Sequence, residues 1–258
     1  GRSTRAAWAV AAGTAVLVAA VFAWSMPGAF KFVTYQRDRG TEVESLGSLV
    51  FHVARHYGWE GEVLLHYGSV EFLGPYVNVV SNAALVLTAL AFGWLLLWRL
   101  RAREWTASTP ADAAFVAVLL FVTTSRVISP QYMVWLVALA AVCVSLRASR
   151  MGGPAVLVVA ATGVTLLEFP VWFGEVVSST WLGITLLAVR NALLVAASLL
   201  ACRRLWRTTI TEPRRAEARA RVAAEALGRV PARHGPRTPS AFPTDRPAAA
   251  AERNATSG

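Results

Sequence analysis

Charged side chains of both signs crowd into one short segment, Arg37-Asp-Arg39-Gly-Thr41-Glu42-Val-Glu44. Thr41 and Glu44 have the spacing of a capping box, in which two residues satisfy free amides at the start of a helix. Those amides, with Arg37 and Arg39 beside them, would attract a phosphate group. The same spacing fits an ordinary surface helix with salt bridges, so both interpretations stay open.

The residues that follow predict an amphipathic helix that ends near Gly58. One of its faces is apolar and the other is polar. The apolar stripe consists of Val43, Leu46, Val50 and Val53, and the polar face of Ser48, His52, Arg55 and His56. We expect this helix to lie on the outer membrane surface, or against other helices, with its polar face toward water.

His52 and His56 are four residues apart, a spacing at which two histidines on a helix can hold a metal ion. His66 or Glu60 would have to supply a third ligand, and neither stands at a compelling distance in the sequence. We therefore predict solvated histidines on a helix face and no metal site.

A second polar segment, residues 125–132, interrupts a long apolar stretch and contains Arg126, Gln131 and Tyr132. Residues 112–146 extend about 52 Å as helix, whereas two complete membrane spans need about 60 Å. We therefore expect the turn to lie below the outer surface, with Arg126 facing protein or a wet cavity. The alternative is an interfacial Arg126 that extends to the lipid headgroups.

Glu168 and Arg190 are charged residues within apolar segments. Ionisable residues inside a membrane are candidates for function by default. A structural ion pair between two adjacent antiparallel helices is an equally good interpretation of these two.

The composition explains why these charges are exceptional. Of the 258 residues, 55% are hydrophobic and only 16% charged, whereas soluble domains carry about 25% charge. The mean hydropathy is +0.48. We predict an all-α integral membrane protein with about six transmembrane helices, an outer-face amphipathic helix and a disordered C-terminal tail. The expected helices are 6–26, 75–98, 110–125, 131–146, 154–172 and 181–202.

Arginines in the short connections orient the chain. If the helices alternate, four arginine groups fall on one side, and the loop 27–74 falls on the other. We predict a multi-pass protein of the cell membrane with both termini cytoplasmic and a membrane domain at 1–205. The Arg/Ala/Pro-rich tail 206–258 is predicted to be disordered, apart from a short basic helix at 214–228. Its position after the last span favours membrane lipid over nucleic acid as a partner.

The segments Arg39-Gly-Thr-Glu-Val-Glu-Ser-Leu46 and Arg126-Val-Ile-Ser-Pro-Gln-Tyr132, the latter followed by Trp135, resemble the C-terminal half of glycosyltransferase family 87. These are polyprenol-phosphate-mannose-dependent mannosyltransferases of the GT-C class, and the resemblance covers about residues 6–205. It implies transfer of a hexose, usually mannose, from a polyprenyl-phosphate donor to a glycolipid or glycan on the outer membrane face. No cofactor is expected.

The resemblance also assigns roles. Arg39, Arg126, Gln131 and Tyr132 would bind the lipid phosphate of the donor. In this class the catalytic carboxylate usually lies in an outer loop after the first span, upstream of the matching segments, so we expect the chain to begin midway and to lack it. Glu42 or Glu44 would serve only if the loop 27–74 were itself the catalytic loop.

Two other classes of protein stay open. A six-helix transporter or channel subunit would show repeat symmetry and several charges at mid-depth, where only Arg190 qualifies. A non-catalytic membrane subunit would use its tail to recruit a partner.

Overall fold

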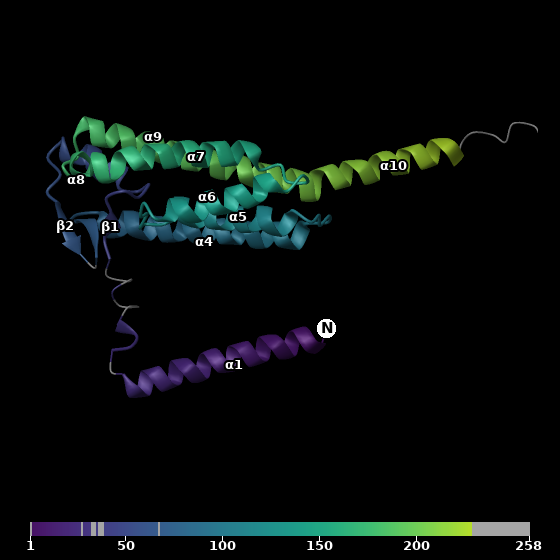
Figure 1. Ribbon diagram of the computed structural model, residues 1–258, viewed down its shortest axis with the longest axis horizontal. Coiled ribbons are helices and arrows are strands. Elements are labelled where there is room, and N and C mark those ends of the chain that lie inside the picture. Colours follow the sequence, from purple (N-terminus) through teal and green to yellow (C-terminus); the bar gives the residue numbers. More distant parts are fainter. Residues whose placement is uncertain (1, 27, 32–34, 36–38, 67, 229–258) are drawn as a thin grey trace, which may run out of the picture. The chain divides into compact units, whose positions relative to one another are not determined.

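The computed structural model describes residues 2–26, 28–31, 35, 39–66 and 68–228. Most of this part is helical, and five helices run side by side as a bundle (Figure 1). The bundle consists of α4 (Val77–Arg101), α5 (Thr109–Thr124), α6 (Tyr132–Ser145), α7 (Gly152–Leu166), which continues into the π-helical turn η1 (Leu167–Val171), and α9 (Trp181–Trp206). With η1 included, these helices and α1 (Arg2–Ser25) agree with the predicted segments within four residues.

Four helical stretches are long and apolar enough to cross a membrane. They are Arg5–Ser25, Val77–Arg101, Gly152–Val171 and Trp181–Ala223. α5 and α6 are also apolar, but they have only 16 and 14 residues, which extend about 24 and 21 Å. Length and composition thus support four of the six predicted spans.

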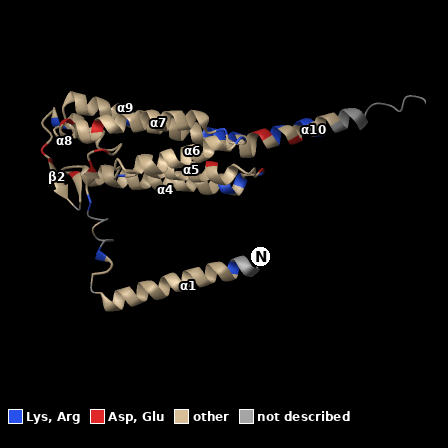
Figure 2. Cartoon of the chain, in the orientation of Figure 1, with Lys and Arg blue, Asp and Glu red and all other residues tan. Residues whose placement is uncertain are grey.

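The two ends of the bundle differ in charge (Figure 2). At one end, α4 and α9 finish with Arg99, Arg101, Arg203 and Arg204, and we call this the arginine end. The opposite end carries a small β-sheet and the turn 125–131, and we call it the sheet end (Figure 1). Such a bias is what the positive-inside rule uses to orient a membrane protein.

Apolar side chains fill the interior between the bundle helices. Phe115 and Leu119 of α5, Leu136 of α6, Val158 of α7 and Leu194 of α9 are all completely buried. Because these side chains come from four helices, they hold the helices together and fix the positions of the residues at the sheet end.

The sheet at the sheet end was not predicted. Its strands are β1 (Thr41–Glu42), β2 (Glu62–His66) and β3 (Ser69–Leu73), in the antiparallel order β1-β3-β2. β1 pairs Thr41 with Phe72 and Glu42 with Glu71. The predicted helix start at Thr41 is therefore wrong, because the backbone of this segment finds its partners in β3 and not in a helix.

The outer-face helix is shorter than predicted and is turned the other way. α3 spans only Leu49–Arg55. Ser48 and His52 are completely buried, whereas Val50 and Val53 are exposed. For Ser48 and His52 the prediction that the polar face meets water is wrong, because these two side chains have partners inside the protein, whereas Arg55 is half-buried and His56 is exposed. Ser48 Oγ, for example, donates to the carbonyl of Val43 at 2.6 Å.

The chain stays helical beyond α9, through the π-helical turn η2 (Arg207–Thr211) and α10 (Glu212–Gly228). The predicted basic helix at 214–228 is confirmed, and the predicted disorder is wrong for residues 206–213, which are helical as well. Thr209 and Ile210 are buried, and Trp98 Nε1 donates to Thr209 Oγ1 at 2.9 Å, so packing carries the helix past its apolar part. The rest of the predicted tail, 229–258, lies outside the described residues.

Candidate functional site

The two segments that the sequence analysis singled out meet at the sheet end. The amide of Glu42 donates to the carbonyl of Arg126 at 3.1 Å. In return, the Ile128 amide donates to Glu42 Oε2 at 2.6 Å. Arg126 Nη1 lies 3.5 Å from the carbonyl oxygen of Arg39. Segments more than 80 residues apart in sequence thus form one hydrogen-bonded unit.

Glu42 and Glu44 lie inside this unit, at 4% and 3% exposure. Burial raises the pKa of Glu42 well above its usual value, and the neighbouring Glu44 raises it further. Burial also raises the pKa of Glu44, to about 7, against the opposing effect of Arg190. Each of these two neighbouring carboxyl groups therefore opposes ionisation of the pair.

Arg190 connects Glu44 to the interior of the bundle. It comes from the middle of α9 and is completely buried. Its Nη2 donates to the carbonyl oxygen of Glu44, and its Nη1 lies 3.9 Å from Glu44 Oε1. Its Nε lies 3.3 Å from Glu168 Oε2, so these two residues form the ion pair that was one of the two interpretations left open. The neighbouring Asn191 donates to the carbonyl of Ser45 at 3.4 Å. We call Glu44, Glu168 and Arg190 the buried knot.

Glu71 is a member of the site that sequence reasoning missed. Arg39 Nε donates to Glu71 Oε1 at 2.8 Å, and the Gly40 amide donates to Oε2 at 2.9 Å. Ser69 Oγ donates to Oε1 at 2.6 Å. Burial alone would raise the pKa of Glu71, but these hydrogen bonds outweigh burial and lower it. Glu71 is therefore an ionised partner that compensates the charge of Arg39.

Gly40 allows this arrangement because it has no side chain. A Cβ at this position would collide with the backbone carbonyl of Phe72 in β3. The strand and the Arg39 backbone therefore approach each other only with glycine at position 40.

Arg126 has a different environment from Arg39. It is half-buried, and its Nη1 donates to Ser81 Oγ of α4 at 2.9 Å. Within the described residues, it has no ion pair with a carboxylate. Its guanidinium charge is therefore held in place by neutral groups and is not compensated by direct pairing.

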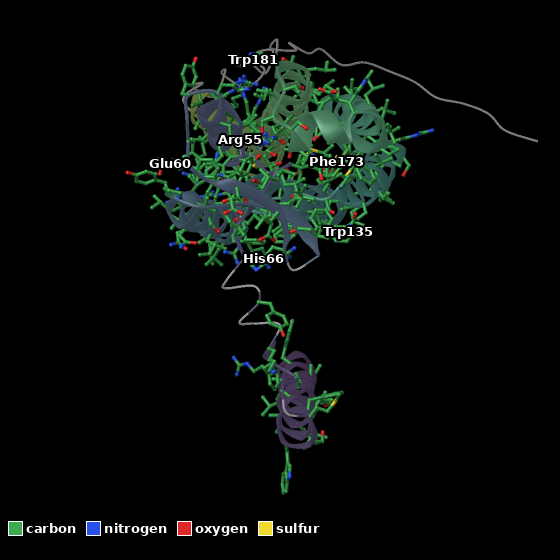
Figure 3. The ribbon with its side chains drawn as sticks, turned by 90° about the vertical axis from the view of Figure 1, so that its left-hand side faces the viewer. Arg55, Glu60, His66, Trp135, Phe173 and Trp181 are labelled. Carbon is green, nitrogen blue, oxygen red and sulfur yellow. The ribbon has the colours of Figure 1, made fainter. Side chains whose placement is uncertain are left out.

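Gln131 and Tyr132 lie where α6 begins. Gln131 is exposed at the N-terminal boundary of the helix. The ring of Tyr132 stacks on Trp135, with 4.7 Å between centroids and 18° between planes. Trp135 is half-exposed and lies at the sheet end in the end-on view of Figure 3. These side chains border the Arg126 turn, but no hydrogen bond joins them to it within the described residues.

An apolar cavity of about 390 Å³ extends between α4, α5 and α9. Leu46, two residues after Glu44, lines it together with Leu87, Leu120 and Leu199. The cavity thus begins beside the site and continues along the apolar part of the bundle.

No family model, curated protein or solved structure matches this chain. These comparisons thus identify no family for this chain.

His52 connects the Glu42–Glu44 segment to the turn before α9, which contains Ser179. Its Nε2 lies 2.8 Å from the carbonyl of Val43, and its Nδ1 lies 2.8 Å from Ser179 Oγ. A carbonyl only accepts, so Nε2 carries the proton and Nδ1 accepts from the Ser179 hydroxyl. Arg55 Nη1 also donates to Ser179 Oγ at 2.8 Å. His52 is therefore a neutral, buried side chain that joins Val43 to Ser179, and it is not solvated as predicted.

His56 lies against the first residue of α9. Its ring stacks on Trp181 at 4.5 Å between centroids, and its Nε2 donates to the carbonyl of Ser179 at 2.7 Å. Figure 3 shows Trp181 and Arg55 on neighbouring elements at this end. Among the residues that the structure describes, no three His, Cys, Asp or Glu side chains are grouped to hold a metal ion.

We expect His52 to stay neutral until the pH falls to about 4. Burial lowers its pKa from 6.5 to about 4, and Arg55 adds to this effect against the hydrogen bond to Val43. Between these two pH values the unfolded chain binds more protons than the folded protein. The contribution of His52 to the free energy of unfolding is thus fully present above pH 6.5, and it is lost as the pH falls toward 4.

Nitrogen NMR of the histidine-labelled protein in detergent micelles measures this protonation directly. Ser179→Ala removes the donor to Nδ1 and should move the pKa of His52 upward. A His52 ring that is already protonated at pH 6 in the unaltered protein would contradict a neutral His52 that accepts a hydrogen bond from Ser179.

Proposed function

We propose that the protein is a membrane glycosyltransferase that moves a hexose, most simply mannose, from a polyprenyl-phosphate donor to a glycolipid or glycan acceptor. The observation that carries the proposal is the direct contact between the segments that begin at Arg39 and at Arg126. Each segment resembles the same transferase family, and each supplies an arginine at the sheet end.

The reaction breaks the bond between the anomeric carbon and the phosphate oxygen, and negative charge grows on the departing lipid phosphate. A cation that is fixed before the reaction stabilises that charge best. Arg126 meets this requirement, since its guanidinium is held by Ser81 and is not paired with a carboxylate in the described part of the chain. Arg39 is compensated by Glu71, so we assign it a positioning role through its carbonyl contact with Arg126.

The general base that deprotonates the acceptor hydroxyl is a separate question. The pKa of about 7 suits Glu44 to proton transfer near neutral pH. Burial at 3% exposure, however, holds its carboxyl away from an acceptor. A base role for Glu42 or Glu44 stays a prediction, and their contacts to Ile128 and Arg190 support a role in shaping the site.

The apolar cavity supports a donor with a long hydrocarbon chain. Its walls are almost entirely apolar, and Leu46 joins it to the segment that carries Glu44. A prenyl chain in this cavity would place its phosphate at the sheet end, because the chain's polar terminus must leave the hydrocarbon layer.

The proposed setting is the cell membrane, with the sheet end outside and the arginine end in the cytoplasm. α5 and α6 are short for complete spans, but the turn between them contacts β1, where the Glu42 amide donates to the Arg126 carbonyl, so part of the turn's backbone is satisfied within the protein. The charges of the buried knot gather toward the segment Glu42–Ser45. A transporter would instead need charges along a path across the membrane.

The test is a transfer assay in membranes that contain the protein expressed from its native gene. We expect labelled hexose to pass from a polyprenyl-phosphate donor to an endogenous glycolipid or glycan. With synthesis of the lipid-linked donor blocked, a nucleotide-linked hexose should give no transfer. Equal transfer from the nucleotide donor under that block would contradict the proposal, as would no transfer above membranes without the protein.

A further inference from the structure

Three arginines line a cavity of about 270 Å³ at the arginine end of the bundle. Arg150 comes from the turn before α7, Arg204 from the last turns of α9, and Arg207 from η2. Thr208 and Glu212 complete the lining. Three guanidinium groups face a single carboxylate, so the cavity is suited to an anion. Its volume is several times the ~30 Å³ of one water molecule, which leaves room for a phosphate group.

The local backbone holds Arg204 in this position. Its Nη1 donates to the carbonyl oxygen of Arg150, which ties α9 to the turn before α7. The guanidinium also lies over Gly153, where a Cβ would come within 2.8 Å of Nη2. Gly153 is in the first turn of α7, and this helix has no side-chain cap. The positive end of the α7 dipole therefore adds to the field of the arginines.

Glu212, the one carboxylate that lines the cavity, forms only a weak ion pair with Arg207. Its Oε1 lies 3.5 Å from Arg207 Nη2, and both side chains are more than half exposed. Ion pairs of this kind contribute little stability. A phosphate, which can accept two hydrogen bonds from one guanidinium, would therefore displace Glu212 from Arg207.

Two tryptophans, Trp94 and Trp206, lie near this cavity, at the depth along the bundle where we expect lipid headgroups. Trp206 lies between Arg204 and Arg207 in sequence, with its ring 6.1 Å from that of Trp94. Tryptophan is enriched where lipid headgroups meet the hydrocarbon layer. Val156 of α7 is 68% exposed and lies one turn after Gly153. Apolar surface for acyl chains thus begins directly beside the arginines.

We propose that this cavity binds the phosphate of one anionic phospholipid from the membrane leaflet that surrounds the arginine end. The fatty acyl chains lie along the exposed apolar side of α7, where Val156 and Val159 are 68% and 57% exposed. The inference rests on the membrane insertion in the proposed function and does not depend on hexose transfer. A protein without transferase activity would still bind the lipid.

Native mass spectrometry of the full chain in detergent, with added phosphatidylglycerol or phosphatidylcholine, tests the site. We expect one phosphatidylglycerol to be retained at least about ten-fold more tightly than phosphatidylcholine. Both lipids carry the phosphate group, but the quaternary ammonium of choline cancels its charge and would be repelled by the arginines. The variant R150Q/R204Q should lose most of this preference. R101Q/R147Q removes the same charge from exposed positions at the same end, and should keep it.

Two single variants give opposite signs and leave the tie between Arg204 and Arg150 intact. Arg207→Gln should weaken phosphatidylglycerol retention several-fold, and Glu212→Gln should strengthen it. Equal losses in R150Q/R204Q and R101Q/R147Q would replace the site with a diffuse charge effect and overturn the proposal. Displacement of the lipid by equimolar inorganic phosphate would overturn it in favour of a site for a soluble anion.

Discussion

Replacing Arg190 with methionine should destabilise the protein more than any other single substitution of a charged residue in the bundle. Arg190 is completely buried and faces Glu168 and Glu44. Removing one partner from a buried charge network leaves the others without compensation and costs about 3–5 kcal/mol. For a protein of this size, that loss lowers the melting temperature by on the order of 10 °C.

The matched control is Arg203→Met, which lies in the last turn of the same helix, α9, at an exposed position. It should change the melting temperature little. The double variant Glu168→Gln, Arg190→Met should recover part of the loss, because it removes a carboxylate that the first substitution leaves unpaired. The melting temperature of each of the three variants is measured in detergent, from the fraction of protein that stays monodisperse after heating. Equal stability of the Arg190→Met and Arg203→Met proteins would show that the buried knot does not hold the bundle.

The helices of the bundle were predictable because their signals are local. Pro110 stands in the first turn of α5, as expected from its missing amide hydrogen and fixed φ. The side chain of Thr180 caps α9 by accepting from the Gly183 amide at 3.3 Å, which is also a local signal. Apolar length and proline position therefore place most helix ends within a few residues.

The sheet was not predictable in the same way. Val63, Val70 and Phe72 favour strands, and two residues, 67 and 68, separate β2 from β3 as in a hairpin. The pattern is short, however, and glutamates interrupt it. Thr41 and Glu44 gave a stronger local signal for a helix, and pairing with β3, some 30 residues away, overrode that signal.

The site shows the same division. The resemblance assigned Arg39, Arg126, Gln131 and Tyr132 to the donor phosphate. The structure brings the segments of Arg39 and Arg126 into contact, whereas within the described residues no hydrogen bond joins the side chains of Gln131 and Tyr132 to Arg126. Glu71 and Ser179 were missed because their partners lie 32 and 127 residues away, at Arg39 and His52. Spacing along one helix cannot reveal such contacts. It also suggested that His52 meets water, since nothing local indicates that a polar face packs against protein.

The largest effect on activity should come from Arg126. If its guanidinium binds the phosphate of the lipid donor, Arg126→Ala should reduce hexose transfer by at least about a hundred-fold, the scale seen when one charge-stabilising donor is removed from an active site. Insertion should be unaffected. Arg126 is only half-buried, and its side-chain bonds are to Ser81 Oγ and the Arg39 carbonyl, so its loss leaves no charge unpaired.

Arg126→Lys separates phosphate binding from a merely interfacial arginine. Lysine carries the charge but lacks the planar group that grips two phosphate oxygens, so transfer should recover only in part. An arginine that merely extends to lipid headgroups would be replaced fully by lysine, because both side chains reach that level.

Ser81→Ala is the matched positioning variant, since it keeps the guanidinium and removes the hydroxyl 2.9 Å from Nη1. It should raise the KM for the donor more than it lowers kcat. Hexose transfer in membranes matched for protein amount compares the variants, and full activity with alanine at position 126 would remove Arg126 from the reaction.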